Sequence, residues 1–180
     1  YNPANDTAIV NFPTGEKPES KLWWNDGYWW GSLFSPSANA FHIYRLNWGT
    51  QTWEDTGVPL DTRPNTKADT LWDQANNTLY VASHISVDIG DAVNSTGSSV
   101  GRLFKFTYNP TTQTYAPVAG FPKNVNADKT EILVLAQELS NANRLWVTYV
   151  SRTSSGATSR VYVNQSTNGG VTWGTPIDLS

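Results

Sequence analysis

Three eight-residue windows of this 180-residue chain align with one another without gaps, and this internal repeat constrains the fold more than any other feature. The windows begin at residues 46, 108 and 166, with the sequences LNWGTQTW, YNPTTQTY and STNGGVTW. Each ends in Thr followed by an aromatic residue, and each follows a run of aromatic or β-branched residues. Every window therefore predicts a strand, a tight polar turn and a second strand.

A second pattern, which lies between the windows, predicts three hairpins. Residues 22–24 and 28–34 are separated by Asn-Asp-Gly, and Asp-Gly supplies the positive φ angles that a tight hairpin turn requires. Two further hairpins are predicted from the same form, for 70–72 with 78–83 and for 132–135 with 145–150. The chain should therefore contain four consecutive strands three times, in units of about 20–57, 67–119 and 129–178.

A four-stranded antiparallel unit that recurs every ~60 residues is typical of a β-propeller blade. Aromatic residues make up 13% of the chain, in short runs broken by turn formers, and no window is rich in helix-forming residues. We therefore expect an all-β fold of about three four-stranded antiparallel blades. The alternative is a β-sandwich in which the similarity of the windows is coincidental.

The third window, Ser166-x-Asn168-x-Gly170-x-Thr172-Trp173, resembles the Asp box, S-x-D-x-G-x-T-W, of the sialidase-like β-propeller family with BNR repeats. Asn stands in place of the usual Asp, and the other two windows resemble degenerate copies. The resemblance implies a propeller and a structural role for the box. In that role the Asn side chain would bind neighbouring amides, Gly170 would be left-handed and Trp173 would fill the gap between sheets.

Three blades do not close a ring, because propellers typically have four to eight and three would leave two exposed edges. We expect the chain to be part of a longer, six-bladed protein, and the start at Tyr1 without Met or leader also suggests a processed or excised piece. The alternative is that copies of the chain associate to complete the ring. Remaining blades or other copies are thus expected partners.

Composition excludes several other classes of function. The net charge is −3 with scattered Lys and Arg, which argues against nucleic acid, and no apolar run approaches the ~18 residues that span a membrane. Cys is absent, so disulfides, thiol catalysis and Cys-based zinc sites are excluded. The Trp-, Thr- and Asn-rich composition suits an extracellular or cell-surface protein, whose partners could be glycans or other surface proteins.

Charged residues precede the first strand of each unit, where a propeller binds ligands at its channel mouth. Alignment of these strands places Glu19, Lys67 and Lys129 in one rank, and Lys21, Asp69 and Glu131 in the next. Arg63 lies just upstream in the second unit and is the only arginine at the expected ligand face. These side chains could bind a polar ligand, or they could form a solvated rim with weak ion pairs.

No catalytic residue is expected in this chain. Sialidases use three arginines, a Tyr-Glu pair and an Asp acid/base, and this sequence lacks their Phe-Arg-Ile-Pro signature. Asp69 and Glu131 could form the carboxyl pair of another glycosidase, but nothing in the sequence sets their separation. The first hypothesis is a non-catalytic module for carbohydrate or protein binding or for structural assembly. The alternative is a piece of a sialidase-like glycoside hydrolase whose essential residues lie on missing blades.

Other candidate ligand contacts receive structural interpretations. Trp48, in a turn, is expected to be exposed and is the better ligand-contact candidate, whereas the doublets 23–24 and 29–30 should each place one Trp on either sheet face and pack in the core. His42 and His84 lie in expected strands without a second metal ligand at suitable spacing. The segment 86–91 has two acidic residues that could hold calcium, but an exposed loop is the simpler interpretation. No metal or cofactor is therefore expected.

Overall fold

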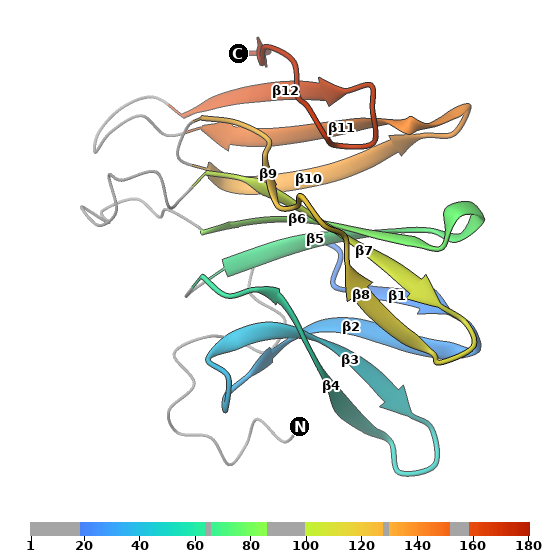
Figure 1. Ribbon diagram of the computed structural model, residues 1–180. Helices are drawn as coiled ribbons and strands as arrows, with labels where there is room; N and C mark the ends of the chain where they lie inside the picture. The colour runs from blue at the N-terminus through green and yellow to red at the C-terminus, as the bar shows by residue number, and fades with distance from the viewer. Residues whose placement is uncertain (1–18, 64–65, 86–99, 128–129, 152–158) are drawn as a thin grey trace.

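The computed structural model describes residues 19–63, 66–85, 100–127, 130–151 and 159–180. Within these ranges the chain is all-β, and its strands form three antiparallel sheets (Figure 1). The first sheet contains β1 (Leu22–Asn25), β2 (Tyr28–Ser35), β3 (Ala40–Asn47) and β4 (Thr52–Asp61). The second contains β5 (Thr66–Asp73), β6 (Thr78–Ile85), β7 (Arg102–Asn109) and β8 (Thr114–Pro117), with β9 (Lys123–Asn124) also paired to β7. The third contains β10 (Thr130–Glu138), β11 (Asn141–Ser151), β12 (Arg160–Ser166) and β13 (Ile177–Asp178).

Each sheet has its four principal strands in the order of the sequence, which confirms the predicted succession of hairpins. The first hairpin turns at Asp26 and Gly27, whose φ angles of 51° and 79° are those that the Asp-Gly pair predicts. The second turns through a short 3₁₀ helix, Gln74–Asn76, which ends at a left-handed Asn77. The windows at 46 and 108 join the third and fourth strands of their sheets, as predicted.

The second sheet lies between the other two and is buried on both faces. Leu79 and Val81 on β6 belong to a core cluster shared with the first sheet, whereas the alternate residues Tyr80 and Ala82 belong to a separate cluster shared with the third sheet. Strand alternation places neighbouring side chains on opposite faces, so one strand serves both cores. Successive sheets with separate cores are not the single shared interior of a two-sheet sandwich. The all-β class and the antiparallel sheets are confirmed, and the closed propeller remains a prediction.

The fourth strand of the third sheet differs from the prediction. A strand was expected to continue directly from the third window, but β13 begins only at Ile177 and is two residues long. Gly174 N–H donates to the carbonyl of Gln165 (2.9 Å), which holds this segment against β12 before pairing resumes. Pro176 cannot donate a ladder hydrogen bond, so the strand starts after it.

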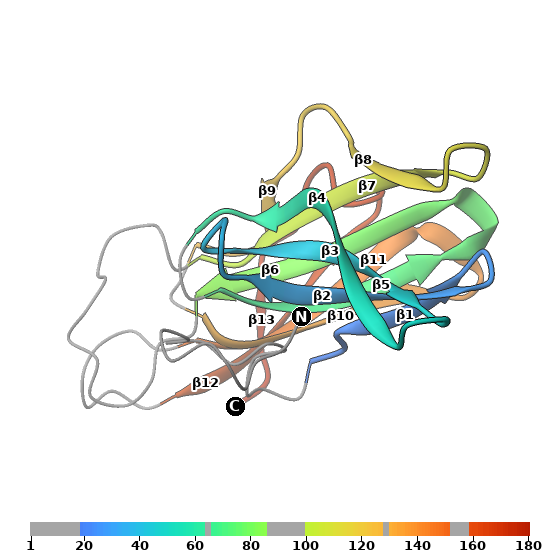
Figure 2. The ribbon, with the colours of Figure 1, turned by 90° about the horizontal axis from the view of Figure 1, so that it is seen from below.

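In each sheet the turn from the first to the second strand and the turn from the third to the fourth lie at one end of the molecule, and the β2–β3 turn and the segments that lead into β5 and β10 lie at the other (Figures 1 and 2). β5 lies beside both β1 and β10. Thr70 N–H donates to the carbonyl of Ser20 (2.9 Å), which joins the first and second sheets through their backbones. The first strands of the three sheets therefore meet, and the charged residues that precede them are brought together.

Candidate functional site

The third window forms a turn closed by its own side chains. Ser166 Oγ accepts from Gly170 N–H (2.9 Å), and Asn168 Oδ1 accepts from Thr172 N–H (2.9 Å) while Asn168 Nδ2 donates to Thr172 Oγ1 (2.8 Å). Gly170 has a φ of +85°, in the left-handed region that the sequence predicts for it. The side chains of the resemblance thus act within the turn, as a structural element would.

The first and second windows share a different turn. Asn47 Oδ1 accepts from the N–H groups of Gly49 and Thr50, and Asn109 Oδ1 accepts from the equivalent groups of the second window. Gln51 and Gln113 are both left-handed, with φ angles of 55° and 54°. These two windows therefore form the same type of turn, and the third window forms a different type of turn at the equivalent place in its sheet.

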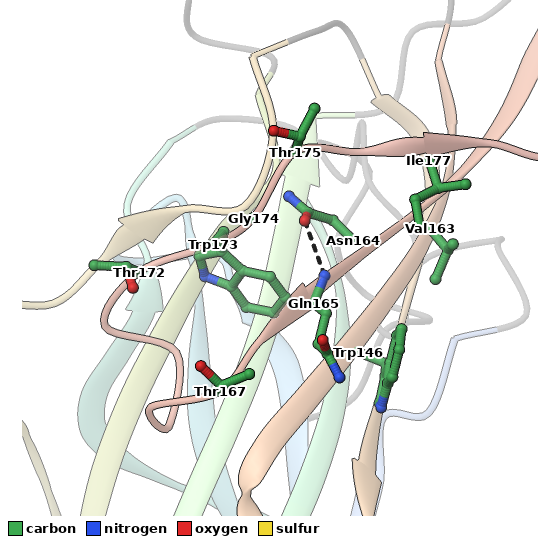
Figure 3. A pocket seen from close by; sticks show the side chains of 10 residues that line it. All are labelled: Trp146, Val163, Asn164, Gln165, Thr167, Thr172, Trp173, Gly174, Thr175 and Ile177. Carbon is green, nitrogen blue, oxygen red and sulfur yellow. Dashed lines mark hydrogen bonds between the residues drawn. The ribbon is translucent and has the colours of Figure 1, made fainter.

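The outer face of the third sheet carries a pocket of about 310 Å³ beside this turn (Figure 3). Two indoles, Trp146 of β11 and Trp173 of the third window, lie among amide and hydroxyl side chains. The other lining residues are Val163, Asn164, Gln165, Thr167, Thr172, Gly174, Thr175 and Ile177. Trp173 packs against the core between the second and third sheets but is only partly buried, so it fills the gap between sheets less completely than expected.

Trp48 is 49% exposed in the turn of the first window, which agrees with the exposure expected of it. It lies on the first sheet, whereas the pocket of Trp146 and Trp173 lies on the third. Trp146 was not singled out in the sequence. Its signal is strand alternation, because the neighbours Leu145 and Val147 face the core and Trp146 must face outward.

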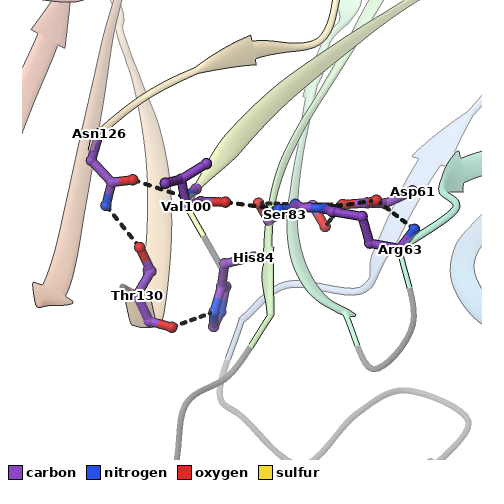
Figure 4. Close-up of polar contacts among 8 residues, drawn as sticks. Asp61, Arg63, Ser83, His84, Val100, Asn126 and Thr130 are labelled. Atoms are coloured by element: carbon purple, nitrogen blue, oxygen red, sulfur yellow. Dashed lines mark hydrogen bonds and ion pairs between the residues drawn. The ribbon is translucent and has the colours of Figure 1, made fainter. Parts of the chain in front are cut away.

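Arg63 is not a free ligand-binding cation. Its guanidinium donates to the Asp61 carboxylate, with Nη2 2.7 Å and Nε 3.1 Å from Oδ2. It also donates to the backbone carbonyls of Val100 (2.9 Å) and Ser83 (3.1 Å) (Figure 4). Ser83 Oγ also donates to Asp61 (2.7 Å). Arg63 and Asp61 are both nearly buried, so this pair ties the end of the first sheet to the second. A nearly buried pair with several hydrogen bonds is not the weak solvated ion pair of an exposed rim.

Asp69 joins all three sheets. Its Oδ1 accepts from the N–H of Ser20 (2.5 Å), which precedes β1, and its Oδ2 accepts from the N–H of Leu135 on β10 (2.7 Å). Asp69 is 5% exposed, and burial raises the pKa of its carboxyl despite these hydrogen bonds and the positive charge of Lys21. Both oxygens are occupied by backbone donors, so the geometry suits a structural clamp between first strands.

Glu19 and His84 form a second buried link at the same end. The two ring nitrogens of His84 lie 3.1 Å from Glu19 Oε1 and 3.2 Å from the carbonyl of Thr130. Thr130 Oγ1 in turn accepts from the side chain of Asn126 (Figure 4). Lys21 Nζ lies 3.2 Å from Glu19 Oε2. Burial lowers the pKa of Lys21, and Glu19 opposes that shift.

Replacing Glu19 with Gln is expected to reduce the free energy of unfolding at pH 7 by about 2 kcal/mol, because the nearly buried ammonium of Lys21 loses its counter-charge and His84 loses its carboxylate hydrogen-bond partner. Burial would raise the pKa of Glu19, but the hydrogen bond with His84 and the charge of Lys21 outweigh it and lower that pKa. A carboxyl group whose pKa is lower in the folded than in the unfolded protein stabilises the fold at pH values above its unfolded pKa of ~4.3. That stabilisation is lost as the pH falls through the folded pKa. Urea titrations of both proteins should therefore differ at pH 7 and converge toward pH 3. A difference that stays constant with pH would contradict the ionic role of Glu19.

The remaining predicted site residues are placed as follows. Lys67 lies on β5 opposite His84 and is 6% exposed, and Glu131 is partly buried on β10. Lys129 and the acidic segment 86–91 lie outside the described residues. The structure thus brings together Glu19, Lys21, Asp69 and His84. The expected solvated rim does not hold for the three charged residues among them that were ranked, Glu19, Lys21 and Asp69, because their side chains are nearly buried where the first strands meet.

Two further findings concern the described part of the chain. Its His, Asp and Glu residues form no group of three or more with the arrangement of a metal site. None of its helical segments is long and apolar enough to cross a membrane.

Comparison with known proteins gives a limited result. Neither the known protein families nor the curated proteins contain a match to this sequence. Among solved structures, a GH74 enzyme from Niastella koreensis is similar to 84% of this chain, with 23% identity and a TM-score of 0.46. The exo-β-1,3-galactanase 1,3Gal43A from Clostridium thermocellum is similar over 87%, with 10% identity and a TM-score of 0.32. The chain spans 20% of the length of the first of these proteins and 47% of the second.

Proposed function

We propose that this chain is a non-catalytic β-propeller module that functions by offering its outer sheet faces to a partner. The observation that carries the proposal is the outer face of the third sheet. Ile177, which lines the pocket of Trp146 and Trp173, is 58% exposed, and Val134 and Val161 on the same face are 44% and 38% exposed. Exposed apolar side chains gathered on one sheet face beside an aromatic pocket favour an interaction surface.

The opposite end of the stack is also apolar. On the outer face of the first sheet Leu22, Trp24 and Trp29 are 44%, 49% and 37% exposed, and the two indoles contact each other edge to face at 5.5 Å. The chain therefore offers two aromatic sheet faces, one at each end of the stack, and structural assembly is the function that uses both.

The charged residues support a role without catalysis. Asp69 binds two backbone N–H groups, Arg63 binds Asp61, and Glu19 lies between Lys21 and His84. A glycosidase needs two carboxyl groups that can reach a bound sugar, and these are committed to contacts between sheets. The proposal includes an extracellular or cell-surface location, where glycans or surface proteins would be available partners.

Carbohydrate binding at the third sheet is the second candidate. It is favoured by the Gln165 amide and the Thr175 hydroxyl, which have no side-chain hydrogen bond to another described residue and lie beside two indoles. Flat apolar rings pack on pyranose faces while such groups bind hydroxyls. A piece of a sialidase-like hydrolase remains the alternative for a longer protein.

Assays with fluorogenic sialosides and glycosides test the proposal directly. The chain should release no fluorophore above buffer, and Asp69→Ala should give the same trace as the unchanged protein. A known sialidase serves as the positive control. Release by this chain that is lost on Asp69→Ala would overturn the non-catalytic function, whatever the outcome of the binding experiments.

A further inference from the structure

The two contacts between sheets follow one rule. In each, an aromatic residue on the second strand of one sheet is covered by the turn between the third and fourth strands of the next sheet. Trp30 on β2 is 1% exposed, and its ring lies 5.0 Å from that of Tyr115, which ends the second window. Tyr80 on β6 is 3% exposed, and a Cβ on Gly169 of the third window would lie 3.7 Å from its hydroxyl.

Trp146 occupies the equivalent place on the third sheet. Trp30 pairs across the strands with Arg45, Tyr80 with Lys105, and Trp146 with Gln165, so each aromatic residue stands beside a long polar side chain on the third strand. Arg45 lies over the Trp30 ring at 5.9 Å and Lys105 over the Tyr80 ring at 5.2 Å. Trp146 is only partly buried, because no described turn from a following sheet covers it and its place is a pocket.

The turn of the first window has the shape that would fill the pocket beside Trp146. Its turn has the same hydrogen bonds and the same left-handed Gln as the second window, whose Tyr115 packs on Trp30 and accepts a hydrogen bond from Trp23 Nε1 (2.8 Å). Trp53 aligns with Tyr115, and Trp48 of the same turn is 49% exposed. Within the described chain no turn of another sheet packs against this turn as the second window packs on the first sheet.

From this repetition we infer that the pocket of Trp146 and Trp173 takes the first-window turn of a second copy of the chain, in a head-to-tail contact. The inference rests on the proposed function and names the partner of the same face. Trp53 of the second copy would pack on Trp146 as Tyr115 packs on Trp30. Such a contact is heterologous, and it forms a closed ring or an open chain according to the rotation between copies.

A closed pair is the assembly expected. Two copies supply six sheets, within the four to eight of known propellers, and closure covers both outer faces of both copies. The second contact of a closed pair forms within the complex, which favours the pair over open chains held by single contacts. Sedimentation equilibrium should therefore give twice the 19.9 kDa monomer mass, without larger species at higher concentration.

Variants of each face provide the test. Trp146→Arg removes the receiving face, and Trp24→Glu with Trp48→Glu removes the inserting face, at two positions that are each 49% exposed. Each variant alone should self-associate at least ~30-fold more weakly, as for loss of a central anchor. An equimolar mixture should form a pair that stops at two copies, because each protein keeps one intact face. Leu139→Glu, at a turn residue that is 105% exposed, is the matched control and should associate normally.

Four results would overturn the inference. The first is that the chain is a monomer at all concentrations, and the second is that either face variant associates as strongly as the unchanged protein. The third is that the mixture fails to pair although both variants retain the native circular dichroism spectrum. The fourth is that the chain is a monomer that binds a neutral oligosaccharide through Trp146. The last would favour carbohydrate as the occupant. Each leaves the absence of turnover unaffected, so failure here is distinct from failure of the proposed function.

Discussion

Gly170→Ala is expected to lower the free energy of unfolding by about 3 kcal/mol, the sum of left-handed strain and overpacking in a filled core. Gly170 has a φ of +85°, and a Cβ there would lie 2.1 Å from Leu103 Cδ2. Leu103 is completely buried on β7 of the second sheet, in the core shared with the third. The Leu103 side chain therefore has little room to move. To accept the new Cβ, the turn of the third window must shift away from the second sheet.

Gly27→Ala is the matched control. Gly27 has nearly the same φ, +79°, but no heavy atom within 4 Å of the position of a Cβ. The free energy of unfolding of Gly27→Ala should therefore fall only by the cost of backbone strain, about 1 kcal/mol. Urea denaturation of both variants separates strain from contact. Equal losses would show that Leu103 yields, and that close packing of this turn does not hold the third sheet on the second.

The strand order and the faces of the first hairpin could be predicted from the sequence. Alternation assigns one Trp of each doublet to either face, and Trp23 and Trp30 are buried at 5% and 1% whereas Trp24 and Trp29 are 49% and 37% exposed. The sequence did not show that the exposed pair would be uncovered, because a propeller blade was expected to have a neighbour on both faces. The outer face became a candidate surface only with the sheets in place.

The environment of the charged residues could not be predicted. A Lys, Asp or Glu before a strand is ordinarily solvated, and only the approach of β1, β5 and β10 makes these residues internal. Asp69 and Leu135 are 66 residues apart, and no local pattern signals that the carboxylate will meet that backbone N–H. The rank alignment compares positions along the strands and carries no information on burial, whereas Glu19, Lys67 and Asp69 are 5–6% exposed.

The three windows show that sequence alignment could not predict the type of each turn. Their shared Thr-aromatic ending predicts one turn, yet Asn47 and Asn109 close one kind of loop and Ser166 closes another. The position of the capping side chain decides the geometry, since an Asn at the second position binds the next turn amides and a Ser at the first reaches Gly170. Alignment of the last two residues alone does not carry that information.

Asp69→Ala is expected to lower the free energy of unfolding by about 3 kcal/mol at neutral pH. The change leaves two backbone N–H groups without their acceptor, the partly buried one of Ser20 and the buried one of Leu135, at ~1–3 kcal/mol each. Relief of the buried charge offsets part of this loss. Because Ser20 precedes the first sheet and Leu135 belongs to the third, the variant should loosen both contacts at once, and amide exchange should accelerate at both positions.

The pH dependence and a second variant distinguish this clamp from a simple cavity. Burial raises the pKa of Asp69, so its stabilising contribution is complete below the unfolded pKa of ~3.9 and decreases as pH rises through the folded value. The loss on Asp69→Ala should therefore be larger at pH 3.5 than at pH 7. Asp69→Asn keeps one acceptor oxygen and turns its NH₂ toward the other donor, so about half of the loss should remain. A full loss on Asp69→Ala with none on Asp69→Asn would mean that one oxygen suffices, and that this carboxylate does not join the three sheets through both of its atoms.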